Sequence, residues 1–491
     1  MSHSSVCPAL YQVNTRVWLT ALGESLGRRA TLDDIPDAEL DRLAGRGFDW
    51  IWLLSVWQTG NAGRQVSLNH PAWRREFAVA LPGIRDEDIG GSGFAITEYS
   101  VHRWLGGDAA LARLRQRLRA RGIRLMLDFM PNHVGLDHPW LEQRPDYFVH
   151  ATLQDLAKAP QNYSRIQTPA GPLVLAHGRD PHFDGWPDTL QLDYSNSSVH
   201  DAMLDELLKI AGQCDGLRCD MAMLLLPHVF ETTWGLRIAP FWPDAIRQVR
   251  DRVPGFTFMA EVYWDLEWEL QQQGFDYTYD KRLYDRLVAG EVGPVREHLG
   301  APVEFQSRLA RFLENHDEPR AAAVFAPHVH MAAAVITFLS PGLRFFHAGQ
   351  LEGHMTRVSP HLVRGPAETS DPVIADFYDR LLQVLRRPVV RAGWWQLLDC
   401  VPEEGKADAV IAWVWSGPAG PRLLVMVNYS AETSRCIVRL PFEDLGGRTW
   451  RLSDLLSSTV HERHGDDLAS AGFRIEVPPW GHWAMEVDGL A

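Results

Sequence analysis

Short apolar runs alternate with helical patterns through most of this 491-residue chain. Leu111, Leu114 and Leu118, for example, recur at helical spacing within 108–121, behind Asp108 as the expected helix cap. Strands that alternate with helices in this way form parallel sheets. Eight runs are expected to be strands, which predicts an α/β fold of the (β/α)₈ TIM-barrel type: Thr15–Leu19, Phe48–Val56, Ile123–Phe129, Gly216–Cys219, Phe256–Ala260, Phe275–Tyr279, Arg311–Glu314 and Leu343–His347.

Two stretches interrupt this rhythm. Residues 132–198 are rich in Pro, Asp and His and show little helical period, and so long a loop inside a compact domain is usually functional. After residue 391, period-two runs such as VIAWVWSG and RLLVMVNYS appear between turn residues. We therefore expect a barrel over 1–391, with a short loop-rich insertion after the third strand at 132–198, and a C-terminal antiparallel β-sandwich domain over 392–491.

Charge and composition exclude several classes of partner. The formal net charge is −14, so no global basic field attracts nucleic acid or an anionic membrane. No apolar run is long enough to span a bilayer, and the start MSHSSVCPALYQ lacks the pattern of a signal peptide, so we expect a cytoplasmic protein. The five cysteines are scattered, which indicates neither a disulfide framework nor a zinc site. No feature indicates the oligomeric state.

Four apolar runs end in an acid, namely Asp128, Asp220, Glu261 and Asp317. In a (β/α)₈ barrel the C-terminal ends of the strands meet at one mouth, so acids far apart in sequence can lie together there. A single acid in such a place is ordinarily a helix cap or an ion-pair partner. Four of them, three with Arg, His or Asn within the same short segment, indicate an active site.

Glycoside cleavage requires an ionised carboxylate and a protonated one close together. Arg218 precedes Asp220 by two residues and lies on the same side of the strand, so its guanidinium is expected to keep Asp220 ionised. Glu261 follows the apolar run FTFMA, an environment that is expected to raise its pKa. These opposite environments predict Asp220 as nucleophile and Glu261 as acid/base.

Four segments resemble the conserved regions of glycoside hydrolase family 13, the α-amylase family, in the right order. They are DFMPNH at 128–133, GLRCD at 216–220, MAEVYWD at 259–265 and ENHDEP at 314–319. The segments GSGFAITEYSVHRWLGG at 91–107 and TLQLDYSNSSV at 189–199 also resemble regions of that family. The resemblance covers nearly the whole chain and implies a retaining enzyme for α-glycosides.

The resemblance also implies roles for individual residues. Asp220 would be the nucleophile, Glu261 the general acid/base and Asp317 the third acid, which grips sugar hydroxyls in the transition state. The substrate-binding residues would be Arg218, which holds the nucleophile, His133 and His316, which bond sugar hydroxyls, Asp128, which supports the cluster, and Phe94, an apolar platform where the family usually has Tyr.

The chain departs from the starch-active pattern of the family in two places. Met223 and Leu224 stand where Lys and His often contact the leaving-side sugars, so we expect an apolar surface there and a preference for small substrates. Gln191 replaces an acid in the fifth region, which weakens a calcium site with Asn132 as ligand because calcium needs several oxygens and negative charge. We therefore assign no metal and expect that no cofactor is required.

The expected function is retaining hydrolysis of α-glucosidic bonds in small oligosaccharides or α-glucans. The same covalent intermediate can be resolved by another sugar hydroxyl or by phosphate, so a transglycosylase, an isomerase and a glycoside phosphorylase of the family are alternatives. A further alternative is an inactive amylase-like protein that only binds carbohydrate, although such a protein would be expected to lose at least one of the three acids.

Overall fold

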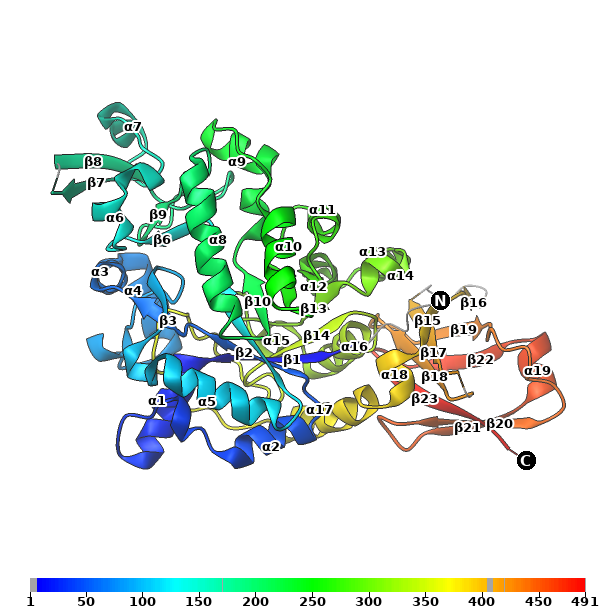
Figure 1. The fold of residues 1–491 in the computed structure, drawn as a ribbon. Coiled ribbons are helices and arrows are strands. Elements are labelled where there is room, and N and C mark those ends of the chain that lie inside the picture. Colours follow the sequence, from blue (N-terminus) through cyan, green and yellow to red (C-terminus); the bar gives the residue numbers. More distant parts are fainter. Residues whose placement is uncertain (1–6, 170, 404–408, 419, 491) are drawn as a thin grey trace.

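The computed structural model describes residues 7–169, 171–403, 409–418 and 420–490. Eight parallel strands close into a barrel in the order β1-β14-β13-β12-β11-β10-β5-β2 (Figure 1). Their bounds are β1 (Ala9–Asn14), β2 (Trp50–Leu54), β5 (Arg124–Phe129), β10 (Gly216–Cys219), β11 (Thr257–Ala260), β12 (Tyr277–Tyr279), β13 (Leu309–Arg311) and β14 (Leu343–His347). The predicted (β/α)₈ barrel is confirmed.

Helices surround the barrel because each presents one apolar face to it. In α5 (Gly107–Arg119) the leucines at 111, 114 and 118 are buried, as their spacing predicts. Asp108 lies inside the first turn rather than at the cap, and its Oδ1 accepts a hydrogen bond from the Val101 backbone N at 2.7 Å. In the described part of the chain, no helix is long and apolar enough to cross a membrane.

The remaining barrel helices follow the strands in sequence. They are α1 (Thr15–Leu26), α2 (Asp37–Gly45), α3 (Asn61–Asn69), α4 (Pro71–Ala80), α8 (Ser197–Ala211), α9 (Pro227–Trp234), α10 (Trp242–Arg252), α11 (Glu267–Gln272), α12 (Lys281–Ala289), α13 (Val292–Leu299), α14 (Val303–Gln306), α15 (Ala321–Val324), α16 (Pro327–Phe338), α17 (Pro372–Leu385) and α18 (Pro388–Ala392).

Two predicted strands are misplaced. Residues 15–19 belong to α1, because the Asn14 side chain accepts a hydrogen bond from the Val17 backbone N at 3.3 Å and starts a helix there. The strand itself is β1, directly before that cap. The seventh strand is β13, so it ends at Arg311, and Glu314 turns away to accept a hydrogen bond from the Ala321 backbone N at 2.7 Å.

The stretch 132–198 contains short elements of its own. They are β6 (His133–Gly135), α6 (Trp140–Gln143), α7 (Leu153–Lys158), β7 (Tyr163–Thr168), β8 (Gly171–Ala176) and β9 (Thr189–Gln191). β7 and β8 form a hairpin, β6 pairs with β9, and the whole projects from the barrel at the upper left of Figure 1. A separate two-stranded antiparallel sheet pairs β3 (Trp57–Thr59) with β4 (Ile96–Val101), and α3 and α4 lie between the two strands in sequence.

The C-terminal part consists of two antiparallel sheets, which confirms the predicted β domain. One contains β15 (Trp394–Leu398), β17 (Val410–Ser416), β18 (Arg422–Asn428), β23 (His482–Gly489), β20 (Thr449–Asp454) and β21 (Val460–His464). The other contains β16 (Cys400–Pro402), β19 (Ser434–Val438) and β22 (Phe473–Val477), and α19 (Gly465–Ser470) follows β21. Residues of both sheets share one apolar core.

Strand β17 joins this domain to the barrel because its side chains alternate between two cores. Val410, Ala412 and Val414 pack in the core between the C-terminal sheets, whereas Trp413 and Trp415 pack in the core of the barrel. Both indole Nε1 atoms donate to the carbonyl oxygen of Leu339, at 3.0 and 2.7 Å. Strand β17 therefore contributes an apolar contact with a shared acceptor to the junction of the two domains, which the hydrogen bond from the Tyr429 hydroxyl to the Leu287 carbonyl oxygen also supports.

We predict that Trp413→Ala lowers the free energy of unfolding by about 3–5 kcal/mol, the usual cost of removing a buried Trp. Guanidinium unfolding followed by circular dichroism measures this value. Trp268→Ala is the matched control, because Trp268 is half exposed and should cost much less. Equal losses in the two variants would contradict the role of the β17 contact.

Candidate active site

Three of the four acids predicted at strand ends lie around the buried guanidinium of Arg218. The fourth, Asp317, lies at the rim. Strand β10 pairs with β5 and β11 so that Arg218 stands opposite Asp128 and Met259. Arg218 Nη1 lies 2.7 Å from Asp220 Oδ1, and Nη2 lies 2.7 Å from Glu261 Oε2. Asp128 Oδ1 is 3.5 Å from Nη1. The structure thus brings Asp128, Arg218, Asp220 and Glu261 into one cluster.

Glu261 is held by polar contacts, so the expectation of an apolar environment around it is wrong. Its Oε2 accepts a hydrogen bond from the Met221 backbone N at 2.7 Å, and its Oε1 accepts one from the Tyr263 hydroxyl at 2.8 Å. The residues before Glu261 are apolar in sequence, but the carboxyl group projects past them to the neighbouring strand. These contacts fix the orientation of both carboxyl oxygens.

The expected contrast between the two carboxyl environments is also wrong, because Arg218 contacts both groups. Burial raises the pKa of Asp220, and Arg218 opposes that rise without cancelling it. Burial raises the pKa of Glu261 as well, Arg218 again opposes it, and the charges of Asp220 and Asp317 add to the rise. Two carboxyl groups that share one cation titrate as a pair. The charge of each group therefore affects the protonation of the other, and the two surroundings do not set the two pKa values independently.

Asp317, His316 and Phe94 line the site next to this cluster. His316 Nε2 lies 3.0 Å from Asp317 Oδ2, and His316 Nδ1 lies 2.8 Å from the Gln12 side-chain amide. The Asp317 side chain is 45% exposed, so it faces the open side of the mouth. The Phe94 ring lies 5.3 Å from the His316 ring, and the Arg218 guanidinium lies 5.2 Å from the Phe94 centroid.

His133 and Asp128 are almost completely buried, at 3% and 2% exposed. His133 begins β6, its ring lies 5.1 Å from that of Trp186 in the insertion, and burial lowers its pKa to about 4. Asp128 Oδ2 accepts a hydrogen bond from Trp52 Nε1 at 3.2 Å, and burial raises the Asp128 pKa to about 6. His133 is therefore neutral at pH 7, and Asp128 supports Arg218 from beneath the cluster.

Sequence reasoning missed several groups that shape the site. Tyr263 lies within the quoted segment MAEVYWD, and its position two residues after Glu261 was the available signal. Met221 contributes only its backbone N and adopts a positive φ of 43°, which side-chain patterns do not reveal. Trp52 and Gln12 come from neighbouring barrel strands, and only the barrel topology places them here.

Met223 and Leu224 do not form a surface at the mouth. Their exposed fractions are 0% and 2%, and both belong to the apolar core of the barrel. They lie in a short 3₁₀ turn after β10 and pack beneath it. The expected apolar contact with leaving-side sugars is therefore wrong, and these two residues carry no information about substrate length.

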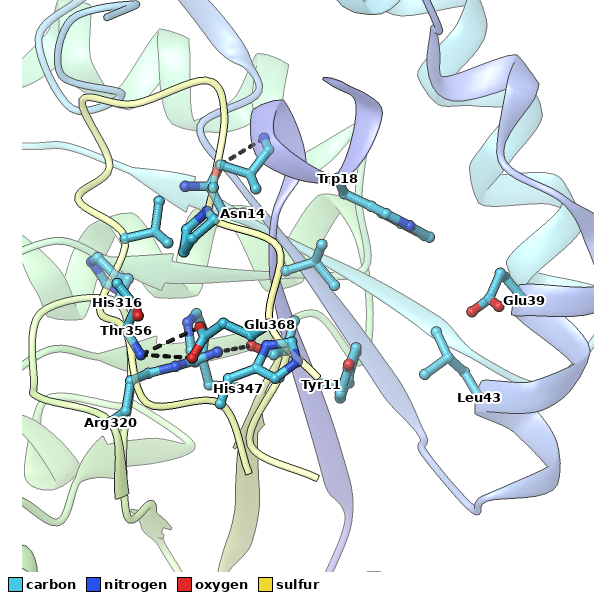
Figure 2. Close-up of a pocket in the computed structure, with 18 of the residues that line it drawn as sticks. Tyr11, Asn14, Trp18, Glu39, Leu43, His316, Arg320, His347, Thr356 and Glu368 are labelled. Carbon is cyan, nitrogen blue, oxygen red and sulfur yellow. Dashed lines mark hydrogen bonds between the residues drawn. The ribbon is translucent and has the colours of Figure 1, made fainter. Parts of the chain in front are cut away.

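A cavity of about 230 Å³ borders His316 on the side of β1 and β14 (Figure 2). Arg320 Nη2 donates to the Ala348 carbonyl oxygen at 2.8 Å on one side of it. Glu368 accepts hydrogen bonds from the backbone N atoms of Met355 and Thr356 on another side, at 2.8 and 3.3 Å. Side-chain and backbone contacts thus fix the walls of a recess next to the predicted site.

The residues implied for a family calcium site do not fit a cation. Gln191 Nε2 lies 3.0 Å from both the backbone oxygen and Oδ1 of Asn132, and 3.1 Å from the Leu192 carbonyl oxygen. Asn132 Nδ2 in turn donates to Gln191 Oε1 at 3.1 Å. The amide group of Gln191 thus donates to the oxygens that a cation would contact, and neither of the two paired side chains carries a negative charge.

We predict that EDTA leaves the melting temperature of the protein unchanged, because hydrogen bonds from Gln191 already satisfy these oxygens. Gln191→Glu should destabilise the chain by about 3–5 kcal/mol, since it would bury an uncompensated charge. Differential scanning calorimetry with EDTA and with calcium measures both effects. A clear fall in the melting temperature of the unaltered protein in EDTA would contradict this assignment.

Comparison with known proteins relates part of the chain to a known catalytic domain. Residues 32–273 match the family model described as the alpha amylase catalytic domain. Alpha-amylase MalA of Haloarcula japonica is 24% identical over 358 residues, which are 71% of this chain and 44% of that protein. Alpha-1,4-glucan:maltose-1-phosphate maltosyltransferase of Burkholderia pseudomallei is 25% identical over 285 residues, 56% of this chain and 22% of that protein. The chain thus matches less than half the length of either relative.

The fold is similar to solved α-amylases over its whole length. The crystal structure of the maltogenic alpha-amylase AmyB from Thermotoga neapolitana superposes with a TM-score of 0.69, covers 99% of both chains and is 18% identical. The strand-end segments at 128–133, 216–220 and 259–265 lie within the residues that match the catalytic-domain model. The comparisons thus relate residues 32–273, just under half of the chain, to the α-amylase catalytic domain, and the whole chain has the fold of solved α-amylases.

Proposed function

We propose that this protein is a retaining α-glycosidase that cleaves α-glucosidic bonds in small oligosaccharides or α-glucans through a covalent glycosyl-enzyme intermediate. The observation that carries the proposal is the contact of one guanidinium with both Asp220 and Glu261, each at 2.7 Å. The shared Arg keeps the two carboxyl groups near each other, which is compatible with the separation of about 5–5.5 Å that a retaining mechanism requires. Inverting enzymes need about 6.5–9.5 Å, to make room for a water molecule.

In the first step, Asp220 attacks the anomeric carbon, and the bond to the leaving oxygen breaks as Glu261 gives that oxygen its proton. Asp220 is then an ester, and Arg218 no longer has to balance its charge. In the second step, Glu261 takes a proton from water, whose oxygen attacks the anomeric carbon and releases Asp220. The hydrogen bond from Tyr263 and the Met221 backbone N hold Glu261 in place through both steps.

The other predicted residues would bind the sugar in the cleaved position. We assign Asp317 and His316 to its hydroxyl groups, since they lie 3.0 Å apart at the open side of the cluster. His133, neutral at pH 7, would bind a further hydroxyl, and the Phe94 ring would pack against the sugar face. Asp128 supports Arg218 and does not touch the substrate in this scheme.

A transglycosylase is the second candidate. The relative from Burkholderia pseudomallei is named as a maltosyltransferase, and its catalytic chemistry up to the glycosyl-enzyme would be the same. A sugar hydroxyl would then replace water in the second step, whereas phosphate would do so in a phosphorylase. Product analysis with maltotriose alone, with an added sugar acceptor and with added phosphate separates the three activities.

We predict that Asp220→Asn reduces turnover by several orders of magnitude and abolishes covalent labelling by a fluorinated glycosyl donor, because the amide is a poor nucleophile. Mass spectrometry of the intact protein detects the label. Asp201→Asn on the exposed face of α8 is the matched control and should label normally. Labelling of the Asp220 variant at an unchanged rate would rule out this nucleophile.

We predict that Glu261→Gln lowers kcat/KM about 10²–10⁴-fold on maltooligosaccharides and far less on glycosides with an acidic leaving group. The acid form of Glu261 is the active one, and burial raises its pKa. Activity of the unaltered enzyme should therefore fall as pH rises through that pKa. The pH profile of the Glu261 variant should lack this alkaline decrease. Glu142→Gln, on the exposed side of α6, should keep it. An unchanged pH profile in the Glu261 variant would contradict the role.

A further inference from the structure

A second cavity, of about 1140 Å³, lies outside the catalytic cluster, between α1, β3, β4 and the segment 85–90. Its lining is rich in arginine although the chain as a whole carries a net charge of −14. The basic residues that line it are Arg16, Arg28, Arg29, Arg64, Arg85, Arg103 and Arg364, and the acidic ones are Glu24, Glu87, Asp88 and Glu98. We call this feature the arginine groove.

Ion pairs neutralise only part of this charge. Arg364 and Arg85 share Asp88, and Arg28 pairs with Asp34 outside the groove. Within the described residues, Arg16, Arg29, Arg64 and Arg103 form no ion pair with a carboxylate. The remaining acids of the groove, Glu24, Glu87 and Glu98, are exposed to solvent.

Arg29, Arg103 and His102 all lie against Trp104 at one end of the groove, and Arg16 is near enough to act on His102 as well. Burial, together with the charges of Arg16, Arg103 and Arg29, lowers the pKa of His102 to about 4. No carboxylate contributes an opposing effect on that imidazole. The local field at this end of the groove is therefore positive, whatever the exposed acids do at the other end.

Arg16 is a buried cation without a counter-ion. Its side chain belongs to the first turn of α1, and the residue is only 7% exposed. Nη1 donates to the Gly91 carbonyl oxygen at 2.8 Å and Nη2 to Thr59 Oγ1 at 3.1 Å, so both contacts are to neutral groups. Burying an unpaired charge is unfavourable, and an anion bound at the groove would compensate it.

Trp104 adds an aromatic surface beside these cations. Half of the residue is exposed, the Arg29 guanidinium lies 4.7 Å from its ring centroid, and the His102 ring lies 4.9 Å from it. An exposed indole next to guanidinium groups that form no ion pair with a described carboxylate suits a ligand with both an anionic group and a ring. Arginine binds phosphate oxygens with parallel hydrogen bonds, which favours phosphate as the anionic group.

We propose that the arginine groove binds a small sugar phosphate, with its phosphate among Arg16, Arg29 and Arg103 and its ring against Trp104. The site is separate from the catalytic cluster, and binding there does not depend on the proposed glycosidase activity. Its occupant is a monoester, because a single phosphate dianion can compensate guanidinium groups that have no carboxylate partner among the described residues.

The groove shares one segment with the active site, residues 86–94. Arg64 donates to the carbonyl oxygens of Ile89 and Asp86 at 2.8 and 2.7 Å, and Arg16 donates to that of Gly91. The same segment ends at Phe94, which packs against His316 and Arg218. A ligand that draws these arginines toward its phosphate acts on the segment that holds Phe94, so we expect occupancy to change kcat/KM.

Isothermal titration calorimetry of the full chain with glucose 1-phosphate tests the proposal, with glucose, inorganic phosphate and AMP as separate titrants. We expect saturable binding of glucose 1-phosphate that weakens at least tenfold in Arg103→Ala and in Trp104→Ala. Arg75→Ala removes the same charge from the exposed side of α4 and should bind as the unaltered protein does. Added glucose 1-phosphate should change kcat/KM of the unaltered enzyme on maltooligosaccharides, and this change should disappear in Arg103→Ala.

Four results would overturn the proposal. Binding that survives in both groove variants would locate the ligand elsewhere, including the catalytic cluster. Equal weakening in Arg75→Ala would show a general charge effect. Inorganic phosphate that binds as tightly as glucose 1-phosphate would exclude the ring contact, and tighter binding of AMP would assign the groove to nucleotides. Binding of glucose 1-phosphate with unchanged kcat/KM would support the binding site but would contradict the expected effect of the ligand on catalysis through residues 86–94.

Discussion

The buried guanidinium of Arg218 is the interaction on which the site depends. It is 1% exposed and lies within 3.5 Å of three carboxyl groups, those of Asp128, Asp220 and Glu261. Burial alone would lower the pKa of Arg218, but these anions raise it well above its usual value. A cation in the middle of a barrel requires such partners, because an unpaired buried charge is strongly destabilising. The barrel supplies them from three adjacent strands, β5, β10 and β11.

Aromatic rings complete the surroundings of this cation. The guanidinium lies 5.4 Å from the Trp52 ring, 5.2 Å from that of Phe94 and 6.0 Å from that of Tyr279. These rings exclude water from one side, which strengthens each charge interaction inside the cluster. The same arrangement makes the proton of Glu261 depend on the charge of Asp220, so formation of the proposed ester would itself change the acidity of Glu261.

Sequence predicts the parts of this molecule that depend on local pattern. The strands at Gly216–Cys219 and Leu343–His347 have the predicted bounds, because each is a short apolar run directly bounded by polar or turn residues. The run TRVWL also resembles a strand, yet the Asn14 side chain caps it as a helix. One hydrogen bond from a flanking residue thus makes this segment a helix, although its hydrophobic pattern is compatible with a helix or a strand.

Contacts between strands lie beyond such patterns. The order of the strand-end acids indicated that they meet, but not that Glu261 would bind Arg218 rather than sit in an apolar pocket. Met223 and Leu224 show the same limit, because whether an apolar pair faces the mouth or the core depends on the turn after β10. The arginine groove combines segments from residue 16 to residue 364, so no single stretch of sequence could reveal it.

The most direct test of the proposed retaining mechanism is the configuration of the first product. Proton NMR of a fresh maltotriose digest distinguishes the α- and β-anomers before mutarotation equilibrates them. The close pairing of Asp220 and Glu261 on Arg218 predicts that the newly formed reducing end appears first as the α-anomer. Initial formation of the β-anomer would contradict a covalent intermediate on Asp220 and the account built on it.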